Sequence, residues 1–430
     1  MTPLNALTLE PLTGFSAVVS PLAYICEPFV GFPGYLSTLH RPGYQILSWI
    51  AWISLAIILW HAATRQRLSL RPLLGQLALS WMTIGFVCLY ILFVPLPAVR
   101  IIPPDKDTIF FDIHSHTFFS HDGLASPQEN ISWHLRHNFS AWFITDHWGQ
   151  NDAGITIAIA EKTPPFPTVI EGEEVSDDSG NYLLILGGRA SFFSSRWLSL
   201  KELVKQAHSI GGIVVSAHWW ERNTPLKDLV SAGVDGVEIA NGGHPSIPEG
   251  KRKEALEMSK KAPLTLLAAS DWHGWGSFCT TWNAIRIPGW KGMNTEEKRK
   301  EIISATKEGK SRIIPILLGR KEVQGPWRIT FSPFFSAYYY FSSLDFFHIF
   351  SWIVWVVLIA FLARSRAWLY CALLVVGIGG IFFLVRGGLY LLSAPGSHSN
   401  LLVPAGLALV LIGGGILVYP VRKLLSLLQQ

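Results

Sequence analysis

The chain has 430 residues, which is enough for two or three structural units because a single domain usually takes about 100–200 residues. Half of the residues are hydrophobic and only 15% are charged, compared with about 25% in an average soluble protein. This shortage of charge indicates contact with lipid. The net charge of +5 is small and is not gathered into a basic run, so nucleic acid is not expected as a partner.

Five apolar stretches are long enough to cross a bilayer, which requires about 20 residues. Two precede and three follow a more polar middle: Tyr44–Ala63, Leu73–Leu96, Phe346–Ala363, Trp368–Leu392 and Leu401–Tyr419. Because they lack a polar face, membrane spans are favoured over helices of a globular core. Leu12–Leu36 is also apolar, but three prolines and Glu27 interrupt it, so it fits either a broken sixth span or an interfacial segment.

The apolar stretches divide the chain into an N-terminal membrane region (1–100), a central domain (105–330) and a C-terminal membrane region (340–430). If the spans alternate, the short connections place arginines such as Arg65 and Arg67 on one side of the membrane. The positive-inside rule makes that side cytoplasmic. We therefore expect an integral, multi-pass membrane protein whose central domain is extracytoplasmic. Complete protection of this domain from protease in intact cells would contradict that orientation.

The central domain alternates between short apolar runs and helical segments. The runs that read as buried strands are Thr108–Ile113, Ala141–Thr145, Thr168–Glu173, Tyr182–Leu186, Ile213–Ala217, Gly236–Ala240 and Leu264–Ala269. Two helices are predicted to begin with capping boxes, one from Ser126 to Glu129 and one from Ser199 to Glu202. Strands that alternate with helices predict an α/β fold with a mostly parallel sheet, either open or closed into a barrel.

Histidines and carboxylates follow most of the predicted strands: His114, His116, Asp122, Asp146, His147, Glu171, Glu173, Glu174, His218, Glu238, Asp271 and His273. Because the carboxyl ends of parallel strands meet on one face of the fold, these side chains predict one shared site. Imidazole and carboxylate groups are ligands for zinc, manganese and iron. There are more of them than one ion needs, so we expect two or three divalent metal ions.

Each of these features has an ordinary alternative when it is taken alone. A single His-x-His pair can arise by chance, an Asp can cap a helix, and adjacent glutamates can be solvated. Their recurrence at the ends of several strands favours a common metal site instead. The histidines on predicted helices, His134, His137 and His208, are expected to be surface groups.

The sequence resembles the polymerase and histidinol phosphatase (PHP) family at an ordered set of motifs. These are His114-Ser115-His116, Ser120-His121-Asp122-Gly123, Thr145-Asp146-His147, Gly172-Glu173-Glu174, Ala217-His218, Glu238-Ile239-Ala240-Asn241 and Ser270-Asp271-Trp272-His273. The match runs from Thr108 to about Ile287, and the membrane stretches lie outside it. The resemblance implies a distorted seven-stranded β/α barrel, here inserted between N- and C-terminal transmembrane helices.

The resemblance also implies how the ligands are shared. The first ion is expected on His114, His116, Glu174 and Asp271. Glu174 would bridge to a second ion that His218 also binds. A third ion is expected on Asp122, His147 and His273. Asp146 would orient a neighbouring ligand and bind no metal itself.

One position departs from the family pattern. Many members place a histidine ligand of the second ion immediately before a Leu-Leu-x-Leu-Gly stretch, where this chain has Tyr182. Neutral tyrosine is a poor ligand. The second ion site is therefore expected to be weak, unused or completed by water, and a dinuclear enzyme is an alternative.

The function implied is that of a membrane-anchored, metal-dependent phosphoesterase in which a metal-activated hydroxide attacks a phosphate mono- or diester. His121 and His244 are the candidates for a general acid. The position beside a bilayer suggests a lipid-linked or periplasmic phosphoester. Two alternatives stay open: a metal- or ligand-binding sensor that signals through the membrane helices, and a metal-dependent amidohydrolase.

Overall fold

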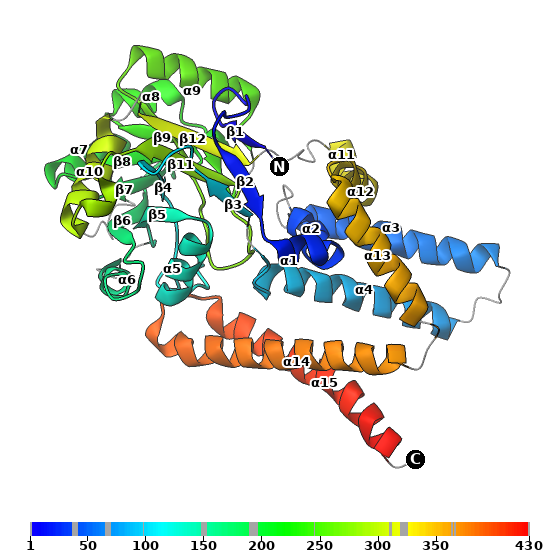
Figure 1. The fold of residues 1–430 in the computed structure, drawn as a ribbon. Helices are drawn as coiled ribbons and strands as arrows, with labels where there is room; N and C mark the ends of the chain where they lie inside the picture. Colours follow the sequence, from blue (N-terminus) through cyan, green and yellow to red (C-terminus); the bar gives the residue numbers. More distant parts are fainter. Residues whose placement is uncertain are drawn as a thin grey trace.

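The computed structural model of the chain describes residues 2–36, 42–64, 70–97, 99–147, 153–188, 197–244, 246–308, 312–318, 326–362, 364 and 367–428. It contains an α/β unit built on a curled sheet, with long apolar helices beside and beneath it (Figure 1).

Ten strands form the main sheet, in the order β1-β12-β11-β4-β5-β6-β7-β8-β9-β10. Their bounds are β1 Pro3–Asn5, β4 Thr108–Asp112, β5 Phe139–Ile144, β6 Thr168–Ser176, β7 Tyr182–Leu186, β8 Ile213–Ser216, β9 Gly236–Asn241, β10 Thr265–Ala269, β11 Thr281–Arg286 and β12 Ile313–Leu318. A separate two-stranded ribbon pairs β2 (Ser16–Val19) with β3 (Val99–Ile102).

The predicted strands are all present as β4 to β10, but the predicted count of seven is wrong for the sheet, which has ten strands. The three additional strands, β1, β11 and β12, could not be recognised because of their composition or their short length. β11 carries the polar Asn283 in its centre, and β12 contains Pro315, which argues against a central strand. β1 is only three residues long.

The sheet is mixed in direction, whereas a mostly parallel sheet was expected. β4, β5 and β6 run parallel, as do β8, β9 and β10, while β7 is antiparallel to both of its neighbours. β11 is antiparallel to β4 and to β12. Because β7 is reversed, its first residue, Tyr182, lies at the edge where β6 and β8 end, and the Ala217 amide donates to the Tyr182 carbonyl at 3.0 Å.

Side chains of β11 link this strand to β10, where the two ends of the curled sheet approach each other. The buried amide of Asn283 on β11 accepts a hydrogen bond from the Ala268 amide at 2.8 Å and donates to the Ala268 carbonyl at 2.6 Å. Thr281 donates to the Ala269 carbonyl at 2.7 Å. These bonds satisfy backbone groups at the free edge of β10, which would otherwise be buried without partners.

Helices cover the outside of the curled sheet: α5 (Pro127–Arg136), α6 (Ala153–Ala160), α7 (Leu200–Ser209), α8 (Leu226–Ser231), α9 (Glu249–Lys261) and α10 (Thr295–Glu308). Both predicted capping boxes are confirmed, because Ser126 and Glu129 cap α5 reciprocally and Ser199 and Glu202 do the same for α7. The apolar sides of these helices and of the sheet form the buried core of the unit.

The remaining helices are largely apolar: α1 (Pro21–Ile25), α2 (Glu27–Leu36), α3 (Pro42–Ala63), α4 (Leu70–Phe93), α11 (Pro326–Thr330), α12 (Ser332–Ser342), α13 (Phe346–Leu362), α14 (Ala367–Ser393) and α15 (Leu402–Leu428). Among the described residues, three helical stretches are long and apolar enough to cross a bilayer: Tyr44–Ala63, Leu70–Phe93 and Gly377–Gly396. Figure 1 shows α3 and α4 side by side, with the α14–α15 pair running beneath α5.

Several predicted spans differ from the helices. In place of the span predicted over Leu73–Leu96, the structure has α4, which begins and ends earlier, at Leu70 and Phe93. It ends before Pro95 because proline lacks the amide that would continue the helix. α13 turns by 118° from α12, and within the described residues the apolar stretch of α15, Leu402–Val418, is shorter than a full span. Within Leu12–Leu36 the chain forms β2 and two short helices instead of one continuous helix.

Candidate metal centre

Backbone hydrogen bonds extend beyond the strands and bring their ends together at one edge of the sheet. The Asp271 amide donates to the His114 carbonyl at 2.8 Å, and the His116 amide donates to the Trp272 carbonyl at 2.9 Å. The Glu174 amide donates to the Thr145 carbonyl at 3.2 Å. The segments that follow β4, β5 and β10 are thus held in register with the second half of β6.

Four buried side chains form the first group: His114, His116, Glu174 and Asp271. The Nε2 atoms of His114 and His116 lie 3.0 Å apart. From Oε2 of Glu174 they lie 2.9 and 3.3 Å away, and from Oδ1 of Asp271 they lie 3.2 and 3.3 Å away. Ligands bonded at about 2.0–2.2 Å to one tetrahedral ion lie about 3.3–3.6 Å from each other, so these four atoms have nearly the spacing of a ligand set.

The second group adjoins the first and contains His116, Asp122, His147 and His273. Oδ2 of Asp122 lies 3.4 Å from Nε2 of His273 and 3.7 Å from Nε2 of His147. His147 also lies 3.4 Å from Oε2 of Glu174. His116 and Glu174 therefore stand between the two groups.

A third group lies on the other side of Glu174. It contains His218, Glu221 and His244, and Nε2 of His218 is 3.5 Å from Oε1 of Glu174. The two oxygens of Glu174 thus face different groups. All the metal residues predicted from the sequence lie in this one assembly: His114, His116, Asp122, His147, Glu174, His218, Asp271 and His273.

Buried polar side chains behind the imidazoles fix how the rings point. Glu238 contacts Nδ1 of His114 at 2.8 Å through Oε1, and its Oε2 accepts from the His218 amide at 2.7 Å. Ser120 contacts Nδ1 of His116 at 2.9 Å and accepts from the His147 amide at 2.8 Å. Partners of this kind hold the Nε2 atom of each ring toward a metal and raise its basicity.

From the sequence, Glu238 was expected in the shared site and Ser120 lay within a family motif, but neither was given a specific role. Glu238 carried a usable signal, because a single carboxylate inside the apolar run Gly236–Ala240 must find a partner once it is buried. Ser120 carried none. Asp146 accepts from the amide and hydroxyl of Thr117 at 2.6 and 2.7 Å and so holds the chain that follows His116.

Two candidate ligands have left-handed backbone conformations. The φ angle is +27° at His218 and +51° at Asp271. Such angles are strained for residues other than glycine and cluster at functional sites, where the surroundings enforce them. Both residues stand at the points where a strand turns sharply into the site.

Among the described residues, histidines surround the two buried carboxylates of the site, and no lysine or arginine pairs with either. The described ion pairs of Glu174 and Asp271 are all with histidines. Burial raises the pKa of both carboxyls, but the neighbouring imidazoles, including His114, outweigh burial and hold each pKa well below its usual range. Oδ1 of Asp271 is buried with no aligned hydrogen bond. A divalent cation suits this donor set, because it supplies the charge that the protein lacks here.

The imidazoles respond in opposite ways to their surroundings. Burial lowers the pKa of His116, but its contacts with Asp271 and Glu174 outweigh burial and raise it to about 9. The pKa of His114 is likewise raised well above its usual value by Asp271, Glu174 and Glu238, against the effect of burial. Burial dominates for His147 and lowers its pKa to about 4.

Four histidines of the α/β unit that lie outside the groups differ in their exposure: His121, His208, His134 and His137. His121 is at the rim, with a 39% exposed side chain whose Nδ1 lies 3.7 Å from Oδ1 of Asp122. His208 is exposed as expected and pairs with Asp235 at 2.8 Å. The prediction of a surface position is wrong for His134 and His137, which are buried. The reason is that α5 turns this face inward, so that His134 stacks on Trp142.

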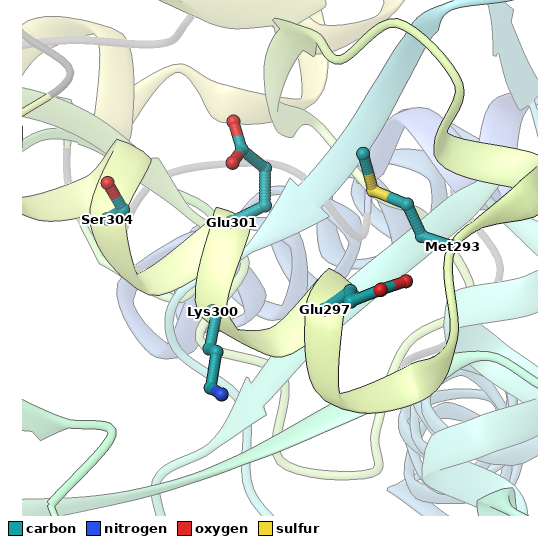
Figure 2. Close-up of a pocket in the computed structure, with 5 residues that line it drawn as sticks. All are labelled: Met293, Glu297, Lys300, Glu301 and Ser304. Carbon is teal, nitrogen blue, oxygen red and sulfur yellow. The ribbon is translucent and has the colours of Figure 1, made fainter.

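Tyr182 lines the site beside the third group. Its ring centroid is 5.1 Å from that of His218, and the guanidinium of Arg222 lies over the ring, 4.4 Å from its centroid. A separate open cleft runs along α10 and is lined by Met293, Glu297, Lys300, Glu301 and Ser304 (Figure 2). It contains none of the grouped residues.

No protein-family model and no curated protein matches the sequence. Part of the chain is similar to solved structures. One is a proposed metal-dependent phosphoesterase from Bifidobacterium adolescentis, at 17% identity, a TM-score of 0.32 and coverage of 38% of this chain and 87% of that one. An amidohydrolase from Chromobacterium violaceum, with bound sulfate and no metal, has 17% identity, a TM-score of 0.33 and coverage of 44% and 96%.

A third solved structure, PsfC from Pseudomonas syringae, has 12% identity, a TM-score of 0.36 and coverage of 56% of this chain and 100% of that one.

Metal binding to the first group is expected to release protons. Near pH 7 the raised pKa of His116, about 9, keeps its ring protonated, whereas a metal requires the neutral ring. Binding of an ion to the first group should therefore release at least one proton. The affinity of this group for the metal should rise as the pH rises toward the pKa of His116. Titration calorimetry in two buffers of different ionisation enthalpy measures this release. Identical binding enthalpies in both buffers would contradict it.

Proposed function

We propose that the α/β unit is a metal-dependent phosphoesterase that uses two or more divalent ions, of manganese, zinc or iron. The observation that supports this most strongly is the sharing of His116 and Glu174 between adjoining groups of ligands. Shared ligands place ions side by side, and closely paired ions suit the displacement at phosphorus, where an attacking and a leaving oxygen must both be stabilised.

The side chains of the chain would divide the work as follows. The first group, with His114 and Asp271, would hold one ion in the buried interior, and the second group would hold another nearer the rim at Asp122. When bound, the ions supply positive charge for the phosphoryl oxygens and lower the pKa of a bound water toward neutrality. His121 is half-exposed beside His147, with ring centroids 4.8 Å apart, and we propose that it gives a proton to the leaving group.

Replacing Asp271 by asparagine tests the proposal. Asparagine has the same shape and tolerates the left-handed backbone of this position, but it removes the carboxylate charge. Metal-dependent hydrolysis of chromogenic phosphate mono- and diesters should fall at least about 100-fold, because even the loss of an outer partner of a metal site costs about 10–100-fold. The measurement is kcat/KM of the purified protein after addition of manganese, zinc or iron.

The exposed Asp228 on α8 provides the matched control, and Asp228→Asn should leave kcat/KM unchanged. Hydrolysis of amides with no turnover of either ester class would shift the assignment to an amidohydrolase. Intact metal binding without any turnover would reject the hydrolase and favour a sensor.

We further propose that the protein is an integral membrane protein and that its substrate is a phosphoester at the membrane surface. The loops that carry the metal groups contact the ends of the apolar helices directly. The Gly276 amide donates to the Leu92 carbonyl of α4 at 3.0 Å. The Ser277 hydroxyl donates to the Val94 carbonyl and accepts from the Leu96 amide, each at 2.9 Å.

The C-terminal helices contact the other loop of the site. The connection between α14 and α15 donates from the amides of His398 and Asn400 to the carbonyls of Phe118 and His121, at 3.0 and 2.8 Å. The neighbouring Leu124 is buried among apolar residues of α14 and α15: Phe383, Tyr390, Leu402 and Leu409. If these helices cross a bilayer, the rim of the site lies at its surface.

An ion pair supports the same arrangement. Arg386, within α14, pairs with Glu129 at the start of α5, so this part of α14 lies against the α/β unit. A charged group within an apolar helix is costly in lipid. The contact with Glu129 therefore gives the Arg386 charge a partner and favours a position for Arg386 against the α/β unit, away from the lipid tails.

A pair of chromogenic diesters tests the membrane-surface proposal. 4-Nitrophenyl hexadecyl phosphate and 4-nitrophenyl methyl phosphate have the same leaving group and charge and differ only in the alkyl chain. For protein reconstituted in phosphatidylcholine vesicles, kcat/KM should be at least about tenfold higher for the hexadecyl ester, because each buried methylene contributes about 0.8 kcal/mol to membrane binding. Equal values for both esters would point to a water-soluble substrate.

A further inference from the structure

We infer that His244 is a metal ligand, and that it completes the ion site that Tyr182 leaves short of a ligand. The inference rests on the proposed metal chemistry but not on which ester is cleaved. The ring of His244 stacks on that of His218, with centroids 3.9 Å apart and planes 13° from parallel. Two imidazoles from different loops thus present their edges to the same space.

Two carboxylate oxygens face that space as well. Nε2 of His244 lies 3.4 Å from Oδ2 of Asp271, and Nε2 of His218 lies 3.5 Å from Oε1 of Glu174. Both oxygens are the ones that the first group does not use. The distances are those expected between neighbouring ligands of one ion bonded at about 2.0–2.2 Å. The site would therefore share both carboxylates with the first group and add two imidazoles of its own.

The loop that follows β9 is built to hold His244 in this place. Oδ1 of Asn241 accepts from the amides of Gly243 and His244 at 2.8 and 3.0 Å, and Nδ2 of Asn241 donates to Glu238 at 2.8 Å. Glu238 also contacts Nδ1 of His114 at 2.8 Å. The position of His244 is thus tied to the first group through one buried network.

Glycine is required where this loop passes the site. A Cβ atom added at Gly242 would lie 2.6 Å from the Ser270 carbonyl oxygen, and one added at Gly243 would lie 3.0 Å from both the carbonyl oxygen and Oδ2 of Asp271. Larger residues would push the loop away from Asp271. The two glycines therefore bring the backbone close enough for His244 to reach the Asp271 carboxylate.

Glu221 contacts the edge of the His244 ring that lies away from Asp271. Nδ1 of His244 lies 2.6 Å from Oε2 of Glu221, which leaves Nε2 directed at Asp271. A carboxylate behind a histidine in this way orients the ring and strengthens it as a ligand. Glu221 and His244 come from different loops, so this contact depends on the folded structure.

The described contacts of Tyr182 in the site are made by its ring. Its ring packs against His218, and the Arg222 guanidinium lies 4.4 Å from its centroid. A neutral phenol is a weaker ligand for these ions than an imidazole. His244 supplies the imidazole that this edge of the site lacks, from the loop after β9 instead of the start of β7.

The ion site on the first group and the ion site on His218 and His244 should differ in their affinity for metal. His114 and His116 are fully buried, whereas the His244 side chain is 31% exposed. The ion on His218 and His244 is therefore the one nearer to solvent and the one that exchanges more readily. It would hold zinc, manganese or iron, which accept mixed nitrogen and oxygen ligands.

The test is a metal-binding isotherm that requires no hydrolysis. The full-length protein in detergent is stripped with chelator, dialysed against zinc buffers of stepped free concentration and analysed for bound zinc per chain. His244→Ala should weaken one step at least about 100-fold and leave the tighter steps unchanged. Glu221→Gln should weaken the same step about 10–100-fold, and Tyr182→Phe should change none.

Unchanged tight steps in His244→Ala show that the variant is folded. If that variant does not fold, Glu221→Gln alone decides, because its side chain is exposed and keeps its shape. Isotherms of His244→Ala and Glu221→Gln that match the unmodified protein would overturn the inference, as would loss of the same step in Tyr182→Phe. A phosphoesterase without activity but with the expected isotherms would reject the proposed function and retain His244 as a ligand.

Discussion

The organisation of the α/β unit depends on one electrostatic constraint: two buried carboxylates, Glu174 and Asp271, are surrounded by imidazoles and have no described lysine or arginine partner. A buried charge is costly unless it is paired. The surrounding structure places neutral or protonated rings against every carboxylate oxygen and holds those rings from behind with Glu238 and Ser120. A divalent cation satisfies the same requirement more fully, and that is the basis of the proposed chemistry.

The ends of the strands bring these carboxylates and imidazoles together at one edge of the sheet. The reversal of β7 brings Tyr182 to the same edge as the ends of β6 and β8, and Asn283 links β10 to β11 so that Asp271 is held against the segment after β4. The loops at this edge also contact the ends of the apolar helices, through the amides of Gly276 and Asn400. The candidate metal centre and the apolar helices are therefore joined through the same loops.

Much of this could be predicted from the sequence, and the exceptions have physical reasons. β4 to β10 are apolar runs, and the ligand residues follow them, so strand ends and chemistry coincide. β11 and β12 could not be recognised, because Asn283 and Pro315 obscure their pattern. His134 resembles a surface residue of a helix until Trp142 is seen to stack on it. The pairing of His244 with Glu221 joins two separate loops, and only the tertiary structure reveals it.

The most direct test of the central claim is X-ray absorption spectroscopy at the zinc edge of the zinc-loaded, full-length protein. The account predicts several imidazole nitrogens and carboxylate oxygens at about 2.0–2.2 Å from zinc. It also predicts a metal–metal distance of about 3.5–4 Å, as is usual for paired sites. A spectrum with oxygen ligands alone, or a protein that retains no zinc after removal of the free ion, would contradict it.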